Sequence, residues 1–315
     1  MRAGWLLLMG AAATAQAASP LPQAEAAAWL QKMADAARRT TYEGVFVLRQ
    51  GDSLQTLSIS NRPAGQSNES RLTAMDGTPR EVRCSQTGAI TVVAEGSQVK
   101  MEKRLSRRHF PDLLPADPLA LVHWYEVRLG DEARVAGLDC RNVELLPKDA
   151  FRWGYVLCAE KNSGLPLKAV LINGDHSPLM QYAFAEVKFG TSGNPTGALG
   201  RNPNPMPVMP EPARRLETER IVATALPPGY ARIAAVKRRL PNMTGEVEHW
   251  VFSDGLTHIS LFLSPSTTPV NSVRGQSTHG MVNLMRRQVG PFQATVLGDA
   301  PWAAVETIAM GLEPR

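Results

Sequence analysis

The beginning of the chain carries apolar residues at helical spacing. In residues 20–40, PLPQAEAAAWLQKMADAARRT, one apolar stripe is formed by Ala26, Trp29, Leu30, Met33 and Ala37. Intervals of three and four residues place these side chains on one face of an amphipathic helix. We expect this face to pack on a sheet.

Short strand-like runs follow this helix. The runs VFVLRQ, LQTLSIS, ESRLTAM, EVRCS and AITVVA are separated by the turn signals GD, RPAG, DGTP and QTG. An antiparallel meander is the simplest interpretation. The run HFPDLLPADPLALVHWYEVRL then brings prolines and short helical pieces, and strands resume from Ala133 to about Lys188. The pattern predicts an α+β arrangement, with a helix in front of a sheet.

A break in composition divides the chain. In residues 190–212, GTSGNPTGALGRNPNPMPVMPEP, ten of 23 residues are Gly or Pro. Such a segment cannot hold a helix or a central strand, so it is typical of an extended, partly stiff linker. We therefore expect a larger domain over residues 18–189 and a smaller one over residues 213–315.

The smaller domain has its own alternation of strands and turns. Strand-like runs are ERIVATA, YARIAAVKR, VEHWVFS, LTHISLFLS, GMVNLMRRQ and FQATVLG, and a closing helix is expected from about Trp302 to Met310. The turns SDG and VGP fall where hairpins need them. These signals predict a small antiparallel sheet covered by one helix.

The first seventeen residues, MRAGWLLLMGAAATAQA, have the features of a secretory signal peptide. Arg2 precedes an apolar run, and Ala15-Gln16-Ala17 is a small-residue cleavage signal. The apolar run is shorter than the roughly 20 residues that span a bilayer. No cysteine lies near the cleavage point, so a lipoprotein anchor is not indicated. We expect a product exported to the periplasm, with residues 1–17 removed.

Composition and motifs point away from several functions. The chain's formal charge of +5 falls to +4 without Arg2, too little for the concentrated basic face of a nucleic-acid-binding protein. The six histidines form no ligand pair, and no P-loop, G-x-S-x-G elbow or dinucleotide fingerprint occurs. We therefore expect no metal, no cofactor and no catalytic site.

Basic residues cluster in places. The run KRLSRRHF contains Arg104, Arg107 and Arg108, and the smaller domain adds the pairs Arg238-Arg239 and Arg286-Arg287. These clusters are either solvated strand ends and loops or contacts to an anionic partner such as a phosphorylated lipid or an acidic peptide. Arginine forks suit phosphate and carboxylate geometry, so the second interpretation is physically sound.

Two of the three cysteines bracket a predicted hairpin, CRNVELLPKDAFRWGYVLC. In an oxidising compartment, paired cysteines are expected to form a disulfide. If residues 147–151 form the turn, Cys140 falls directly opposite Cys158, at a separation that a disulfide accepts. A stabilising bridge is favoured over a metal site or a redox switch. The third cysteine, Cys84, is expected to be a buried free thiol.

The same register sorts the side chains of the hairpin. Val143 and Leu145 are expected opposite Tyr155 and Trp153, which gives one strongly apolar side. The disulfide is expected on the more polar side.

Several motifs together are similar to the MucB/RseB family of periplasmic sigma-factor regulators. They are YEGVFV after the amphipathic helix, FRWGYVLCAEKNSGLPLKAVLIN, LPPGY, VEHWVFSDGLTHISLFL and GMVNLMRRQVGPFQATVLGDAP. The resemblance implies an N-terminal unclosed antiparallel β-barrel with helices, similar to lipoprotein carriers, and a smaller C-terminal sheet with one helix. Val143, Leu145, Trp153 and Tyr155 are then candidates to line an apolar lipid cavity.

The resemblance also implies a function. Such a protein binds the periplasmic domain of a membrane-spanning anti-sigma factor and shields it from proteolysis, and lipopolysaccharide or another lipid releases it. The alternatives are a periplasmic lipid or lipoprotein carrier, which would leave the second domain without a role, and an exported enzyme. Whether the chain forms a homo-oligomer stays open.

Overall fold

The computed structural model describes most of the chain between residues 20 and 315. The ranges described are 20–65, 67–85, 88–95, 98–104, 109–115, 117–190, 214–216, 220–239, 245–266, 275–279 and 281–315. The expected signal peptide, and all of the expected linker except Gly190, lie outside these ranges. No helix in the described ranges has the length and apolar character needed to cross a bilayer.

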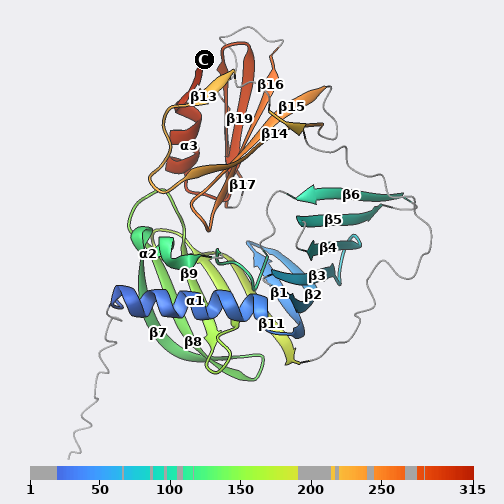
Figure 1. Ribbon diagram of the computed structural model, residues 1–315, viewed down its shortest axis with the longest axis vertical. Helices are drawn as coiled ribbons and strands as arrows, with labels where there is room; N and C mark the ends of the chain where they lie inside the picture. The colour runs from blue at the N-terminus through green and yellow to red at the C-terminus, as the bar shows by residue number, and fades with distance from the viewer. Residues whose placement is uncertain are drawn as a thin grey trace, which may run out of the picture.

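The N-terminal half is built on an eleven-stranded antiparallel sheet (Figure 1). Its order is β6-β5-β4-β3-β2-β1-β11-β10-β9-β8-β7. The strands are β1 (Tyr42–Gln50), β2 (Ser53–Ala64), β3 (Ser67–Ala74), β4 (Arg80–Ser85), β5 (Gly88–Glu95), β6 (Gln98–Arg104), β7 (Tyr125–Val135), β8 (Leu138–Pro147), β9 (Gly154–Glu160), β10 (Pro166–Ile172) and β11 (Pro178–Phe189). Among the described residues the edge strands β6 and β7 do not pair with each other, so the sheet stays open.

Helix α1 (Gln23–Arg39) lies across one face of this sheet (Figure 1). The expected stripe is confirmed, because Ala26, Leu30, Met33 and Ala37 are buried and Trp29 packs against the same core. Arg38 and Arg39 in the last turn suit the negative end of the helix dipole. The proline-rich run supplies a 3-10 turn, η1 (Pro118–Ala120), and the short helix α2 (Leu121–Trp124).

The C-terminal half contains a smaller, seven-stranded antiparallel sheet, ordered β12-β14-β15-β16-β19-β18-β17. The strands are β12 (Arg214–Arg215), β14 (Ala231–Arg239), β15 (Glu246–Ser253), β16 (His258–Pro265), β17 (Gly275–His279), β18 (Val282–Val289) and β19 (Phe292–Gly298). Helix α3 (Trp302–Met310) covers one face, and β13 (Ile221–Ala223) pairs with β20 (Leu312–Pro314). The expected fold class, an open antiparallel sheet with helices plus a smaller sheet with one helix, is confirmed.

Alternation along the strands explains the C-terminal core. Trp250, Leu261 and Val296 point to the α3 side and are completely buried, together with Val305 and Ile308 of the helix. Arg287 on β18 donates from Nη1 to the carbonyl oxygens of Ala309 and Met310, each at 2.9 Å. A guanidinium thus binds carbonyl groups that the helix end leaves without internal partners.

The β8–β9 hairpin contains the expected disulfide, Cys140–Cys158, but its register is different. Cys140 pairs with Glu160, and Cys158 with Asn142, so the direct opposition of the two cysteines was wrong by two residues. The reason is a longer turn, residues 148–153, whose residues bind elsewhere: Lys148 donates to the carbonyl oxygen of Val122 at 2.8 Å.

The two-residue shift preserves which side chains share a face. Val143 pairs with Leu157 and Leu145 with Tyr155, while Trp153 lies in the turn rather than opposite Leu145. Both cysteines of the bridge are buried and belong to the same core cluster as Val143 and Leu145, so the bridge does not lie on a polar side as expected. Cys84 is a buried thiol that forms no disulfide, as expected.

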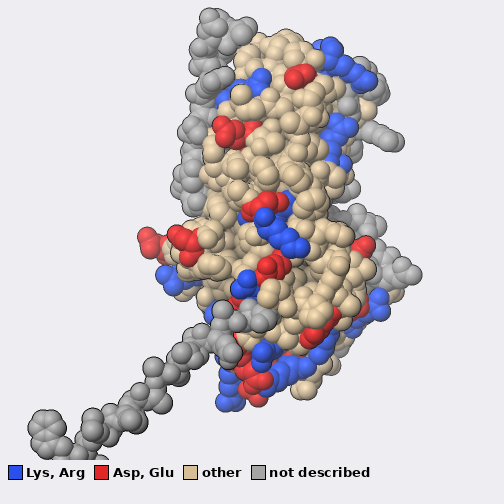
Figure 2. All heavy atoms as spheres, turned by 90° about the vertical axis from the view of Figure 1, so that its left-hand side faces the viewer, with Lys and Arg blue, Asp and Glu red and all other residues tan. Residues whose placement is uncertain are grey.

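Acidic and basic side chains are mixed on the surface. Figure 2 shows one side of the molecule, on which Asp and Glu lie among Lys and Arg in both halves. This face carries no single large basic patch.

His249 lies on the face of the C-terminal sheet opposite α3. Its ring stacks on Phe262 with centroids 4.2 Å apart, and Nε2 is 3.0 Å from the Ser260 hydroxyl. Burial, and then the positive charge of Arg238, lower the pKa of His249 to about 4. The imidazole is therefore neutral in the folded protein at neutral pH.

We expect this histidine to make the protein less stable in acid. An unfolded histidine takes up a proton as the pH falls below about 6.5, whereas the folded one resists until about pH 4. Stability is therefore lost across this interval, by about 2 kcal/mol between pH 7.5 and pH 5. Urea unfolding at both pH values measures the loss. In His249→Phe, which cannot titrate, the pH-dependent loss should shrink by this amount; equal losses in both proteins would contradict the assignment.

Candidate functional site

The face of the N-terminal sheet under α1 is its apolar side. Val143 and Leu145 are completely buried there, in one cluster with Leu30 and Met33 of the helix. Tyr155 packs against this cluster, whereas Trp153 in the turn is outside it. The structure thus brings together three of the four residues expected to line an apolar cavity, but at these positions the space is filled by protein.

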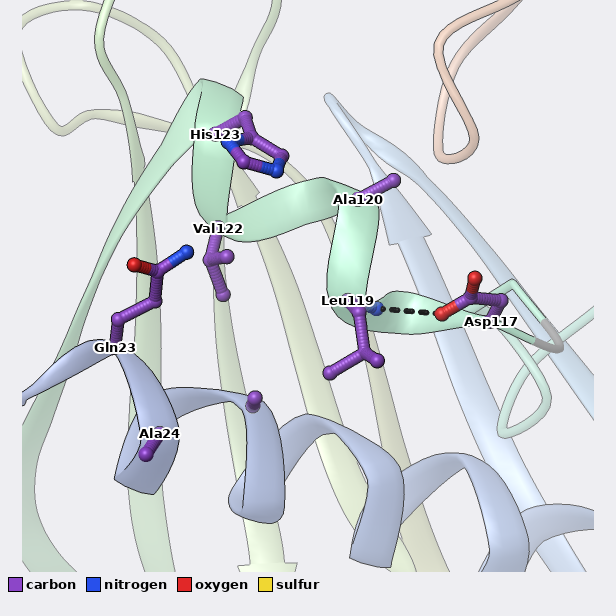
Figure 3. Close-up of a pocket in the computed structure, with 8 residues that line it drawn as sticks. Gln23, Ala24, Asp117, Leu119, Ala120, Val122 and His123 are labelled. Carbon is purple, nitrogen blue, oxygen red and sulfur yellow. Dashed lines mark hydrogen bonds between the residues drawn. The ribbon is translucent and has the colours of Figure 1, made fainter.

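An open groove runs beside α1, at the edge of this covering layer (Figure 3). Its volume is about 680 Å³, and a second hollow of about 390 Å³ adjoins it around Tyr125 and Lys148. The lining comes from α1, η1 and α2: Gln23, Ala24, Ala27, Asp117, Leu119, Ala120, Val122 and His123. Asp117 accepts a hydrogen bond from the Leu119 backbone N–H at 3.1 Å, which fixes the start of η1. The lining of the groove is mostly apolar.

Residues 109–115, called the strap below, cross the apolar face beside α1. Phe110 is buried, stacks on Tyr182 at 5.2 Å and contacts Phe46 and Phe184, each at 5.1 Å between ring centroids. Leu114 is also buried in the core cluster. Only an interruption of the strands was expected here, because isolated apolar side chains next to prolines give no periodic signal.

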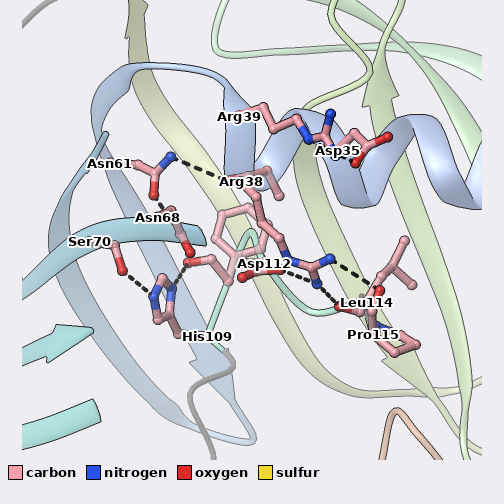
Figure 4. Close-up of polar contacts among 12 residues, drawn as sticks. Asp35, Arg38, Arg39, Asn61, Asn68, Ser70, His109, Asp112, Leu114 and Pro115 are labelled. Carbon is pink, nitrogen blue, oxygen red and sulfur yellow. Dashed lines mark hydrogen bonds and ion pairs between the residues drawn. The ribbon is translucent and has the colours of Figure 1, made fainter. Parts of the chain in front are cut away.

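Polar contacts fasten the strap to α1 and β3 (Figure 4). Arg38 forms an ion pair with Asp112 at 2.7 Å and donates to the carbonyl oxygens of Leu114 and, at 3.3 Å, Pro115. One guanidinium thus binds three groups of a segment that has no strand partner for them.

The other end of the strap is held by a histidine. His109 Nδ1 is 3.1 Å from the Phe110 carbonyl oxygen, and Nε2 is 2.7 Å from the Ser70 hydroxyl (Figure 4). Since a carbonyl can only accept, Nδ1 carries the proton and Nε2 accepts from Ser70. Nearby, Asn61 donates to the carbonyl of Thr40 at 2.9 Å, which fixes the end of α1 over β2.

The arginines expected to contact an anionic partner do not form one group. Arg107 and Arg108 lie outside the described residues, as does the side chain of Arg104 on β6. Arg238 and Arg286 share a face of the C-terminal sheet but lie on β14 and β18, four strand spacings or roughly 19 Å apart. Arg239 is exposed at the end of β14. Arg287 donates hydrogen bonds to the carbonyl oxygens at the end of α3 and so stabilises the C-terminal half.

Three loops and α2 join the two halves of the molecule. We call this region the joint: residues 148–153 and α2 from the N-terminal half, and residues 227–230 and 254–257 from the C-terminal half. Phe151 packs on the C-terminal core, and Leu256 belongs to the N-terminal core. Gly229, at φ +80°, lies against the ring of Trp124, where an added Cβ would be only 2.5 Å from a ring atom. Only glycine fits this approach.

Arg152 is the centre of the joint, and its side chain is completely buried. Its Nε donates to Asp149 Oδ1 at 3.0 Å, Nη2 donates to the carbonyl oxygen of Pro228, and Nη1 is 3.5 Å from Asp254 Oδ2. The guanidinium also lies over the rings of Trp124, Tyr125 and Tyr230, at 5.0, 5.8 and 5.6 Å. Arg152 therefore lies in the turn between β8 and β9 and takes no part in the strand pairing.

Buried tyrosines surround this arginine. Burial, reinforced by the charge of Asp254, raises the pKa of Tyr125 and of Tyr230 above the ordinary value. The Tyr230 hydroxyl donates to the Phe151 carbonyl oxygen at 3.0 Å. Both phenols therefore stay neutral, and the Tyr230 hydroxyl acts as a hydrogen-bond donor between the two halves.

The described residues contain no group of three or more His, Cys, Asp or Glu side chains placed to hold a metal ion. The site thus consists of three features: the apolar face under α1, the groove beside α1 and the contacts at the joint.

Family models match both halves of the chain. The MucB/RseB N-terminal domain matches residues 25–210, and the MucB/RseB C-terminal domain matches residues 216–313. The chain belongs to the MucB/RseB family. The joint thus connects the segments that match the two family models.

Individual relatives agree with this membership. The sigma factor AlgU regulatory protein MucB of Pseudomonas aeruginosa is 28% identical over 314 residues, covering 98% of this chain and 96% of that protein. The sigma-E factor regulatory protein RseB of Escherichia coli K12 is 25% identical over 300 residues, covering 91% of this chain and 90% of that protein. A crystal structure of MucB in complex with MucA(peri) has a TM-score of 0.72 at 26% identity and covers 92% of this chain and 99% of that one.

We expect Arg38→Met to loosen the strap without unfolding the sheet. The substitution leaves the part-buried Asp112 and two carbonyl groups without their donor, so the free energy of unfolding should fall by about 2 kcal/mol. Amide hydrogen exchange should accelerate in residues 112–114 under conditions in which β8 and β9, which open only on global unfolding, are still protected. Arg39→Met is the matched control, because Arg39 is exposed and forms only a surface pair with Asp35. Equal exchange in the two variants would contradict the role of Arg38.

Proposed function

We propose that this protein is a periplasmic negative regulator of an envelope-stress sigma factor. Its ligand is the periplasmic part of a membrane-spanning anti-sigma factor, which it shields from proteolysis. The observation that carries the proposal is family membership over both halves, together with likeness to MucB solved in complex with MucA(peri). The P. aeruginosa relative is itself a sigma factor regulatory protein.

We also propose export by the cleavable signal at residues 1–17, without a lipid anchor, and a division into domains at residues 18–189 and 213–315. The disulfide Cys140–Cys158 supports the export proposal, because such bonds persist in oxidising compartments. The basic residues Arg238, Arg239 and Arg286 are proposed as separate contacts to the acidic groups of a partner.

A lipid is the proposed releasing ligand. Val143, Leu145 and Tyr155 lie beneath α1 and the strap, so an acyl chain can reach them only if a covering segment moves aside. The strap is the better candidate to move, because it buries two apolar side chains, Phe110 and Leu114, where α1 buries six residues. Its fastening also depends on polar contacts of Arg38 and His109. Polar contacts of this kind are exchanged readily for water.

The proposed function is tested with the purified protein and the periplasmic segment of the cognate anti-sigma factor. We expect saturable binding, measured by biolayer interferometry, and about a tenfold loss of affinity when lipopolysaccharide is added, because the lipid favours an arrangement that binds the segment less well. Binding of lipid without any binding of the segment would instead favour the lipid-carrier function. Failure to bind either would overturn the regulator.

The lipid proposal has its own test in Arg38→Met. A fastened strap competes with an acyl chain for the apolar face, so loosening it should tighten binding of a fluorescent fatty acid about threefold to tenfold. The Arg39→Met control should bind as the unmodified protein does. Identical fatty-acid affinity in the two variants would show that the strap does not cover the lipid site.

A further inference from the structure

The bonds that cross the joint differ from those within each half. Among the described residues, three polar contacts cross it: Arg152 to Asp254, Arg152 to the Pro228 carbonyl, and Tyr230 to the Phe151 carbonyl. All are made by side chains, and none belongs to a sheet ladder. Separation of the two halves would therefore break none of the strand pairings that the structure describes.

Each charged member of the joint is also anchored in its own half. Asp149 accepts hydrogen bonds from the Phe151 backbone N–H at 2.9 Å and from Arg152 Nε at 3.0 Å. Asp254 Oδ1 accepts from the backbone N–H groups of Leu256 and Thr257, at 2.9 and 2.8 Å. After separation, Arg152 would keep Asp149 as its partner, and Asp254 would keep its turn.

Hydrogen bonding in the closed joint is incomplete. Among the described residues, Arg152 Nη1, Asp254 Oδ2 and the Tyr125 hydroxyl are buried without a hydrogen-bond partner. The 3.5 Å between Nη1 and Oδ2 supports an ion pair only. Closing the joint removes these atoms from water, and opening it restores their hydration while giving up the ion pair. Because the regained hydration offsets the lost ion pair, a second, open arrangement of the halves is possible.

We propose that the joint is a polar latch, in which contact between Arg152 and Asp254 holds the two sheets in the closed arrangement and its release lets them separate as intact units. On the basis of the proposed function, the closed arrangement is the one that binds the anti-sigma segment. The latch is thus a regulatory element of the binding protein.

The latch is tested by electron-electron distance measurements on the full chain. Spin labels are placed at Asp131→Cys on β7 and Glu306→Cys on α3, two exposed positions in different halves, with Cys84 replaced by alanine. Without any partner, the parent should give one narrow distance distribution. Arg152→Met leaves the buried carboxylate of Asp254 without its ion pair, and Asp254→Asn removes the ion pair across the joint while Arg152 keeps Asp149. Each variant should add a second population at longer distance.

The double variant Arg152→Met/Asp254→Asn distinguishes loss of the latch from general destabilisation of the fold. It contains no uncompensated charge across the joint, and Met fits the apolar rings around residue 152, so its distribution should return toward that of the parent. Arg134→Met, at the exposed end of β7, is the control and should leave the distribution unchanged. Identical distributions in all variants, with lower thermal stability in the single ones, would overturn the latch.

Binding of the anti-sigma segment then tests the regulatory part. We expect about a tenfold loss of affinity in each single variant and recovery in the double variant, in parallel with the distances. A changed distance distribution with unchanged affinity would overturn regulation through the latch. Failure of every protein to bind the segment, the parent included, would overturn the proposed function, while the distance data would still decide whether the latch exists.

Discussion

The structure of the N-terminal half depends on one constraint: its open sheet has an apolar face that it cannot cover by closing on itself. Segments from elsewhere must exclude water from that face. Helix α1 supplies most of the cover, the strap adds Phe110 and Leu114, and the C-terminal half adds Leu256. The covering layer is thus assembled from three parts of the chain, and a protein built in this way can uncover the face by moving one part.

Two of these parts are held by the same physical device. Arg38 binds the carbonyl oxygens of Leu114 and Pro115 in the strap, and Arg152 binds that of Pro228 in the joint. Irregular, proline-rich segments have carbonyl groups but few N–H donors of their own. A guanidinium offers five donors in a fixed plane, so a single arginine can fix such a segment from a neighbouring element.

The sequence predicted the regular elements well, since periodic apolar patterns report directly on which face of an element is buried. Helix α1, the meander of β1 to β5 and helix α3 all lie where the patterns indicated. The disulfide also followed from the spacing of Cys140 and Cys158, but the hairpin register did not. The register depends on the length of the turn, and this turn is set by contacts of Lys148 and Arg152 with residues far away in the chain.

The candidate site was less predictable, because it too depends on contacts between residues far apart in the chain. Val143, Leu145 and Tyr155 could be grouped because alternation puts them on one face, whereas Trp153 was assigned to that face through the wrong register. Neither the strap nor Arg152 lies in a sequence pattern that indicates burial. A single Phe before a proline, or an arginine in a turn, has the composition of an ordinary surface loop, and only the tertiary structure shows that these side chains are buried.

Access to the apolar face and the placement of the two halves are not independent in this fold. Leu256, from the C-terminal half, is part of the cluster that includes Phe110 and Leu114 of the strap. It follows Asp254 by two residues and is fixed to it by a hydrogen bond from its backbone N–H. Any separation at Arg152 therefore withdraws Leu256 from the covering layer, and any ligand that displaces this layer acts on the turn that carries Asp254. Packing alone thus provides a physical route between the proposed lipid on the sheet and the arrangement of the halves, without a dedicated chain of polar residues between them.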